Sequence, residues 1–260
     1  MAGGLVHLVG QWFGLDYSES TTTLLPSSSI GEKNFIRISL GISQIMTFLV
    51  PGLVFMWTLY SRKSWRQLKL ADSPSIKTML LGGLLMVLLL PVVQWVYWFN
   101  HQLPLPDWAI QQESLINNII TSLLQVSTSY EVAINLLVIA ILPALGEELV
   151  FRGVIQQKIA EQLSAHGAIW LTAILFSAIH LQFQGFLPRM LLGAVLGYLF
   201  FWSKNLWAPI FAHFVFNASQ LLIQYWQPSD LEVIEAPSLL VTVGAALFSI
   251  FIAILLRRAS

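Results

Sequence analysis

The sequence predicts an all-α, polytopic bundle of about seven transmembrane helices, from its composition, its apolar stretches and the charges of the segments between them. Of 260 residues, 56% are hydrophobic and only 10% are charged, and the mean hydropathy is +0.72. These values lie far from those of an average soluble domain. The chain also contains no cysteine, which excludes disulfides, a thiolate nucleophile and cysteine-ligated metals.

Apolar stretches that indicate the spans lie at about 38–60, 78–99, 132–146, 168–183, 186–203, 205–226 and 238–256. Several approach the roughly 20 residues that cross about 30 Å of hydrocarbon. The fourth stretch is short, so we expect it to tilt into the protein or to span incompletely. Residues 1–37 are interpreted as a lead-in, and residues 38–260 as a single transmembrane domain.

Two segments outside the spans have patterns of their own. Residues 1–15 are mildly apolar but lack a basic n-region, so we expect no cleaved signal peptide. Between the second and third spans, residues 100–129 are polar, and the part from 108 to 124 is amphipathic. This pattern predicts a helix on the membrane surface, long enough to cap the bundle.

The charges between the spans predict the orientation. Basic residues gather after the first span and at the end of the chain, at Arg62, Lys63, Arg66, Lys69, Lys77, Arg257 and Arg258. The alternate connections hold only acidic charges, at Asp107, Glu113, Asp230, Glu232 and Glu235. Because basic loops face the cytoplasm, the seven-span pattern places the N-terminus outside and the C-terminus inside, provided that the fourth helix crosses.

Two adjacent carboxylates, Glu147 and Glu148, interrupt an apolar region that we expect inside the bilayer. An acidic residue at a helix centre costs roughly 2.5 to 3.5 kcal/mol on insertion scales, so such residues indicate function. Arg152 lies four residues after Glu148 on the same helical face and can neutralise it. Glu147 is rotated by about 100° around the helix. The sequence therefore predicts one paired carboxylate, Glu148, and one available carboxylate, Glu147.

Further polar side chains within apolar stretches are His180, His213 and Asn217. His213 and Asn217 are four residues apart, on one helical face, and can donate hydrogen bonds to a developing oxyanion. Glu147 and His180 together can polarise a water molecule. A single histidine in a membrane helix is equally often an interhelical contact, but the combination with Glu147 favours an active site inside the bundle.

Other residues are interpreted structurally. Gln44 and Asn135 are expected to make interhelical contacts, and Arg189 to snorkel to the interface. Gly193 and Gly197 form a GxxxG ridge that indicates close helix packing. Pro143 removes a backbone donor one turn before Glu147, so we expect a kink or a free carbonyl near the site.

These residues form three ordered motifs, Glu147-Glu148-Leu149-Val150-Phe151-Arg152, then Phe176 to His180, then His213 to Asn217. Written as EExxxR, FxxxH and HxxxN, they resemble the motifs of the CAAX prenyl-protease and bacteriocin-processing (CPBP, or Abi) family of intramembrane proteases. Each motif alone is weak, whereas three in the family's order, each in an apolar helix, are specific. The resemblance covers about residues 132–226, which we expect to be the catalytic core.

The resemblance implies that Glu147 is the general base that activates water, assisted by His180. His213 and Asn217 would line the oxyanion hole, while Glu148 and Arg152 would support the site. The implied activity is that of a CAAX-type intramembrane endopeptidase. The eukaryotic branch removes the last three residues of prenylated CAAX proteins, and bacterial members are assigned to processing or immunity. The expected partners are membrane lipid and a peptide or protein substrate, with lipidated substrates included and nucleic acid excluded. The expected location is the bacterial cytoplasmic membrane, with multiple passes.

The sequence leaves the role of metal open. Glu147, His180 and His213 are the residues that would ligate a zinc ion and lower the pKa of a bound water. However, the chain has no HExxH motif, and these groups lie on three different predicted helices. We expect a mechanism without metal, with zinc as the alternative.

Two competing functions and one inconsistency remain. The same polar cluster would suit a non-catalytic bacteriocin-immunity protein or a membrane scaffold. It would also suit a small proton-linked transporter, although the sequence shows no inverted repeat. Counted from the start of its apolar stretch, His180 is expected nearer the outer side than Glu147 and His213. The sequence alone does not reconcile these depths.

Overall fold

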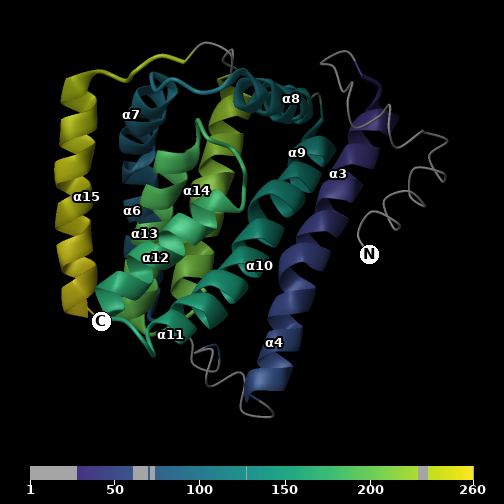
Figure 1. Cartoon of the computed structure of the whole chain (residues 1–260). Coiled ribbons are helices and arrows are strands. Elements are labelled where there is room, and N and C mark those ends of the chain that lie inside the picture. Colours follow the sequence, from purple (N-terminus) through teal and green to yellow (C-terminus); the bar gives the residue numbers. More distant parts are fainter. Residues whose placement is uncertain (1–27, 61–69, 71–73, 127, 228–233, 260) are drawn as a thin grey trace.

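Helices alternate in direction across a bundle in the computed structural model, and one further helix lies across an end of that bundle (Figure 1). The structure describes residues 28–60, 70, 74–126, 128–227 and 234–259, and these contain no strand. The all-α bundle predicted from the sequence is confirmed. The expectations for residues 1–15, and for the basic and acidic residues within 61–69 and 228–233, lie outside the described residues.

Two long helices form one side of the bundle (Figure 1). The first is continuous through α3 (Ile30–Gln44), the π-helical segment η1 (Ile45–Leu49) and α4 (Val50–Tyr60). Ser29 caps its start in a capping box with Glu32. The second runs through α9 (Ser129–Asn135), η3 (Leu136–Ile141), α10 (Leu142–Val150), η4 (Phe151–Ile155) and α11 (Gln156–Ile159).

The second helix is much longer than the apolar run 132–146 that predicted it. It extends over 31 residues, Ser129–Ile159, because buried contacts neutralise the polar side chains in its middle. Glu147, Glu148 and Arg152 therefore lie well inside this helix and not near its end.

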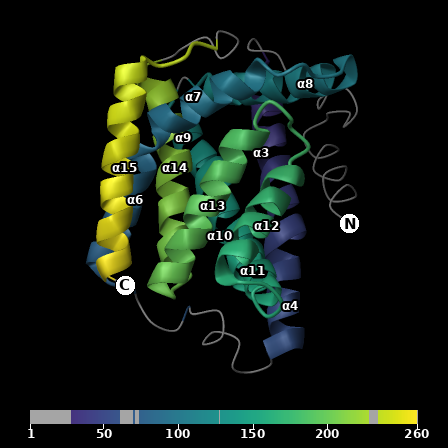
Figure 2. The same ribbon diagram turned by 60° about the vertical axis from the view of Figure 1, so that its left-hand side comes forward.

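A bent pair of helices forms the next rod, α6 (Ile76–Leu88) and α7 (Leu90–His101), with an angle of 40° between them. Pro91 lies in the first turn of α7, and a proline has no N–H to donate to the carbonyl four residues earlier. After α7 the chain turns into α8 (Asp107–Leu124), which lies across the end of the bundle (Figure 2). This is the surface helix that the amphipathic pattern predicted.

The remaining helices are α12 (Ala165–Ala178), α13 (Phe186–Ser203), α14 (Trp207–Trp226) and α15 (Leu239–Ala259). α12 and α13 pack as an antiparallel hairpin. Two glycines of α13 allow their close approach. A Cβ on Gly193 would lie 3.1 Å from the ring of Phe176, and one on Gly197 would lie 2.9 Å from Ile169. The predicted packing role of this GxxxG ridge is confirmed.

The main apolar core lies between α6, α7, α13, α14 and α15 and includes Met86, Leu196, Leu199 and Leu256, all at most 1% exposed. The outer face of α15 is apolar as well. Leu240 is 86% exposed and Phe248 is 63% exposed. Exposed apolar side chains are unfavourable in water and suit a lipid surface.

Four described helices are long and apolar enough to cross a membrane, or five when the bent pair α6 and α7 counts as one span. The four are Ile30–Thr58, Ser129–Ile159, Phe186–Ser203 and Leu239–Arg258. α12 is a shorter apolar helix, as predicted for the fourth stretch. The chain is thus an integral membrane protein, and the predicted number of seven spans is approximate.

The two ends of the bundle differ in charge. The ends of α4, α11, α13 and α15 lie together at one end, whereas α8 and the starts of α9 and α15 lie at the other (Figures 1 and 2). The first end carries Arg257 and Arg258, and the second carries Asp107 in the first turn of α8. Because α12 and α13 form a hairpin, the chain returns to the basic end whether or not α12 crosses completely.

A buried ion pair fastens the long helices to each other near the α8 end. Arg37 of α3 is 1% exposed, and its Nη2 lies 3.0 Å from Oε1 of Glu131 on α9. Its Nε donates to Oδ1 of Asn135 at 2.9 Å, and Asn135 Nδ2 donates to the carbonyl of Leu123 at 2.6 Å. The interhelical contact predicted for Asn135 is confirmed, and it also joins the end of α8.

The charge difference between the two ends predicts labelling from opposite sides of the membrane. Glu161 follows α11 at the basic end with a side chain 59% exposed, and Glu235 is exposed just before α15. Since the chain has no native cysteine, single cysteines can replace each. A membrane-impermeant maleimide should label Glu235→Cys in intact cells and Glu161→Cys only after permeabilisation. Labelling of both positions in intact cells would contradict this topology.

Candidate functional site

The adjacent carboxylates lie in the middle of the bundle on α10. Glu147 is 3% exposed and Glu148 is fully buried. Glu147 precedes the end of the helix at Ile159 by twelve residues, which is about 18 Å at the usual helical rise. Burial of two carboxylates at this depth is unfavourable unless each has partners. Their partners differ, and this difference defines the site.

Glu148 is held by a buried ion pair. Nη1 of Arg152 lies 2.7 Å from Oε1 of Glu148, and both side chains are fully buried. Nη2 of Arg152 donates to the carbonyl of Gly193 on α13 at 2.6 Å. The guanidinium also lies 4.9 Å from the centre of the Phe176 ring, at a distance typical of a cation–π contact. The predicted pairing of Glu148 with Arg152 is present, and it connects α10 to α12 and α13.

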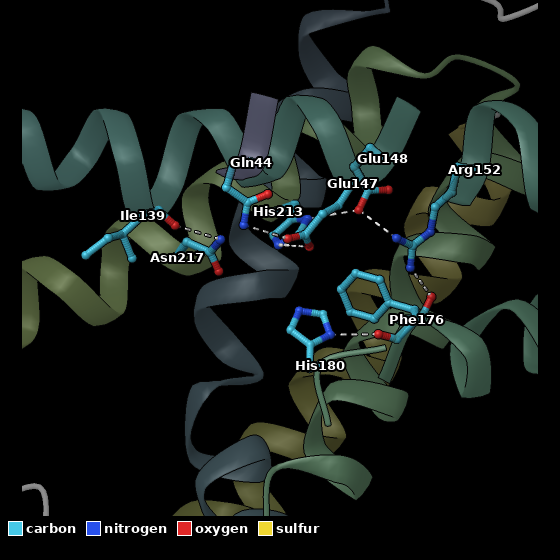
Figure 3. Close-up of polar contacts among 10 residues, drawn as sticks. Gln44, Ile139, Glu147, Glu148, Arg152, Phe176, His180, His213 and Asn217 are labelled. Atoms are coloured by element: carbon cyan, nitrogen blue, oxygen red, sulfur yellow. Dashed lines mark hydrogen bonds and ion pairs between the residues drawn. The ribbon is translucent and has the colours of Figure 1, made fainter. Parts of the chain in front are cut away.

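His213 of α14 joins both carboxylates (Figure 3). Its Nδ1 lies 2.9 Å from Oε1 of Glu148, and its Nε2 lies 4.0 Å from Oε2 of Glu147. A carboxylate only accepts hydrogen bonds, so Nδ1 carries the proton and donates to Glu148. Nε2 is consequently the atom that His213 presents to Glu147.

Glu147 has no arginine or lysine within ion-pair distance among the described residues. Within the described part of the chain, its carboxylate accepts a hydrogen bond from Gln44 of α3, whose Nε2 donates to Oε1 at 3.4 Å. This bond is long, and Oε2 faces His213 at 4.0 Å. Glu147 is therefore the available carboxylate that the sequence predicted.

His180 lies just beyond the end of α12. Its Nδ1 is 2.8 Å from the carbonyl of Phe176, and a carbonyl only accepts, so Nδ1 is the donor. The other ring nitrogen is turned toward Glu147 and His213 (Figure 3). The ring of Phe176 contacts both histidines, with its centre 5.3 Å from that of His180 and 6.1 Å from that of His213.

Asn217, one turn after His213 on α14, bonds to the backbone of the long helix. Its Nδ2 donates to the carbonyl of Ile139 at 3.3 Å. Pro143 follows Ile139 by four residues and has no N–H to donate to that carbonyl. Asn217 therefore satisfies the carbonyl that the proline leaves free, which is the consequence of Pro143 expected from the sequence. Its second amide hydrogen is not used in this bond.

The structure brings the predicted residues together and removes the inconsistency in depth. The long helix continues for twelve residues beyond Glu147, and the 14 residues of α12 rise from the same end of the bundle. At about 1.5 Å per residue these lengths are about 18 and 21 Å. His180 and Glu147 hence lie at similar depths, because the basic end of the long helix is at Ile159 and not at residue 146.

The role of metal at Glu147, His180 and His213 stays a prediction. Across the part of the chain that the structure describes, no three histidine, aspartate or glutamate side chains are grouped so that they could hold a metal ion. Glu147, His180 and His213 converge on one region without forming such a ligand set.

Gln44 and Gly193 are site residues whose role the sequence did not reveal. Gln44 was expected to be an ordinary interhelical contact, but its partner is Glu147. Gly193 was expected to serve packing alone, but its carbonyl also accepts from Arg152. A polar residue within an apolar span was the only sequence signal for Gln44, and a backbone carbonyl leaves no sequence signal at all.

Comparisons with known proteins address the same part of the chain. Residues 129–219 match a family model described as "Type II CAAX prenyl endopeptidase Rce1-like". The match extends from the start of α9 to α14 and includes all three motifs.

Two curated proteins of Bacillus subtilis (strain 168) are also similar. The "Uncharacterized protein YpbD" is 28% identical over 88 residues, which cover 32% of this chain and 42% of that protein. The "Putative membrane peptidase YdiL" is 26% identical over 93 residues, which cover 36% of this chain and 38% of that protein. The matched part thus spans about two fifths of the length of each of these relatives.

No solved structure matches this chain. The family assignment therefore depends on the match over residues 129–219, within which Glu147, His180, His213 and Asn217 all lie. The region that carries the site matches the Rce1-like CAAX prenyl endopeptidase family model, as the resemblance of the three motifs predicted.

Proposed function

We propose that this protein is an intramembrane endopeptidase of the CAAX-protease type that hydrolyses a peptide bond with water activated by Glu147. The observation that carries this proposal is that two adjacent carboxylates have different bonding partners. Glu148 is bound by Arg152 and His213, whereas Glu147 has only a long bond from Gln44. A buried carboxylate without a cation is suited to accept a proton.

The attacking water would lie between Glu147 and His213. Oε2 of Glu147 and Nε2 of His213 are 4.0 Å apart, too far for a direct hydrogen bond and within reach of one bridging water. Glu147 removes a proton while the water oxygen bonds to the peptide carbonyl carbon. The proton then passes to the leaving nitrogen as the C–N bond breaks, which regenerates the carboxylate.

The remaining polar groups would orient the water and stabilise the tetrahedral intermediate. His180 presents its unprotonated nitrogen toward Glu147 (Figure 3) and can accept a hydrogen bond from the water. For the oxyanion, Asn217 would donate from its amide, and His213 would line the same hole. The bonds of Glu148 to Arg152 and His213 fix the orientation of the imidazole.

The substrate would reach the site from within the membrane. A cavity of about 180 Å³ is lined only by apolar side chains, from helices α6, α10, α14 and η3. Its lining includes Ala144, Leu145 and Phe214, which are close in sequence to Glu147 and His213. An apolar wall formed by the helices that carry Glu147 and His213 suits a hydrophobic peptide segment or a lipidated protein. We place the protein in the bacterial cytoplasmic membrane, in contact with lipid.

The first prediction separates catalysis from binding. Glu147→Gln keeps the size of the side chain and can still interact with Gln44, but it removes the base. We expect the variant to accumulate with an unchanged melting temperature and to lose peptide cleavage by at least about 100-fold, as for a lost general base. Cleavage of a membrane-embedded peptide in detergent measures this effect. Full activity would reject the mechanism and favour a non-catalytic immunity or scaffold protein with the same polar cluster.

The second prediction concerns the ion pair. Arg152→Ala leaves Glu148 buried without its cation, which typically costs roughly 3 to 5 kcal/mol. We expect both a lower melting temperature and lost activity. Lys158→Ala is the matched control, since Lys158 pairs with Glu161 just beyond the end of the same helix, with side chains 42% and 59% exposed. Exposed pairs contribute about 0 to 1 kcal/mol, so equal destabilisation of the two variants would disprove the supporting role of Arg152.

The third prediction addresses zinc. We propose that no metal takes part in catalysis, and cleavage should then persist after exhaustive dialysis against a chelator. Elemental analysis of the active protein should find no stoichiometric zinc. Loss of cleavage on chelation, restored by zinc and not by magnesium, would instead assign Glu147, His180 and His213 as metal ligands.

A further inference from the structure

His180 lies in a short connecting segment and not in a helix. Residues 179–185 link α12 to α13, and Leu181 in this segment has a positive φ of 53°, a conformation that is uncommon for a leucine. The imidazole itself is hydrogen-bonded to the carbonyl of Phe176. The direction of its free nitrogen therefore depends on how firmly the segment is held.

A buried carboxylate of α8 holds this segment by its backbone. The N–H of Gln184 donates to both oxygens of Glu113, at 2.8 and 3.1 Å, and Glu113 is 4% exposed. No lysine or arginine lies within ion-pair distance of Glu113 among the residues described. Glu113 is thus a buried carboxylate that accepts from a backbone N–H. Such a charge-assisted hydrogen bond is stronger than one between neutral groups.

An asparagine of α7 holds the segment from the other side. Asn100 is 3% exposed. Its Nδ2 donates to the carbonyl of Phe183 at 2.8 Å, and its Oδ1 accepts from the N–H of Leu187 at 3.0 Å. Both polar atoms of one side chain are thus used to join the end of the segment to the first turn of α13.

Side chains complete the attachment. Trp108 of α8 meets Phe183 edge to face, with ring centres 5.3 Å apart. Arg189 of α13, which we had expected to snorkel to the interface, donates from Nη2 to the carbonyl of Gln182 at 3.0 Å and from Nη1 to its side chain. The segment is consequently fixed by α7, α8 and α13 together.

α7 and α8 precede the region 129–219 that matches the family, and α8 lies across the end of the bundle (Figure 2). We infer that Glu113 and Asn100 are positioning residues for His180, and that α8 is a clamp that keeps its imidazole directed at Glu147. This inference depends on the proposed function. Displacement of a catalytic group by about 1 Å can lower a rate by about 100-fold, so loosening the clamp should impair turnover.

The first test removes the clamp bond. Glu113→Ala should lower kcat by about 10- to 100-fold, the range for a lost charge-assisted hydrogen bond, with KM changed less than about twofold. Glu113→Gln still offers an oxygen to the N–H of Gln184 and should recover most of the activity. Ser114→Ala is the neighbouring control, because Ser114 is exposed and bonds only within α8; its kcat should equal that of the wild type.

The second test asks whether Glu113 acts through His180. In a His180→Ala background, Glu113→Ala should cause no further loss of activity, since the group it positions is absent. An equal loss in both backgrounds would show a merely structural role and overturn the inference. So would a wild-type kcat for Glu113→Ala. Should Glu113→Ala fail to accumulate, Asn100→Ala in the same two backgrounds provides the same comparison.

Hydrogen exchange gives a readout that does not require activity. Glu113→Ala should speed exchange of the Gln184 amide by about 10-fold or more, and Ser114→Ala should leave it unchanged. Unchanged exchange in Glu113→Ala would overturn the clamp whatever the enzyme does. Faster exchange together with a fully active Glu147→Gln would instead show that the clamp exists and that the proposed protease mechanism fails.

Discussion

The arrangement of this protein depends on the burial of one arginine inside an apolar bundle. Arg152 is fully buried, and a guanidinium in a low-dielectric interior must be neutralised and hydrogen-bonded. Glu148 supplies the charge at 2.7 Å, and the carbonyl of Gly193 accepts a second bond at 2.6 Å. Because Glu148 also accepts from His213, this single requirement fixes α10, α13 and α14 relative to one another.

The same ion pair sets the chemistry of its neighbour. Adjacent residues on a helix point about 100° apart, so Glu147 points away from Arg152, the cation that pairs with Glu148. It faces His213 and Gln44 instead. Two identical side chains thus differ in their partners, because Glu148 pairs with Arg152 and Glu147 does not. The proposed water lies on the side of the uncommitted carboxylate.

Helices outside the family-matched region complete the site. α3 contributes Gln44, α7 contributes Asn100 and α8 contributes Glu113. These contacts are made to a carboxylate and to backbone groups. They therefore place little constraint on the residues that flank Gln44, Asn100 and Glu113 in their helices. They also explain why buried polar residues occur in helices that carry none of the three motifs. The matched core supplies the reacting groups, and the surrounding helices hold them in place.

The sequence by itself determined the membrane environment of this protein, its helical class and the pairing of Glu148 with Arg152. All three follow from composition or from helical periodicity. The order of the motifs also predicted the family model that the core matches. Only the tertiary structure decided the depth of His180, because the long helix continues past its polar centre to Ile159. It alone showed that Gln44 meets Glu147 and that Glu113 holds the segment of His180. Such contacts join residues about 70 to 100 positions apart, and no local pattern records them, because they arise only when separate helices pack.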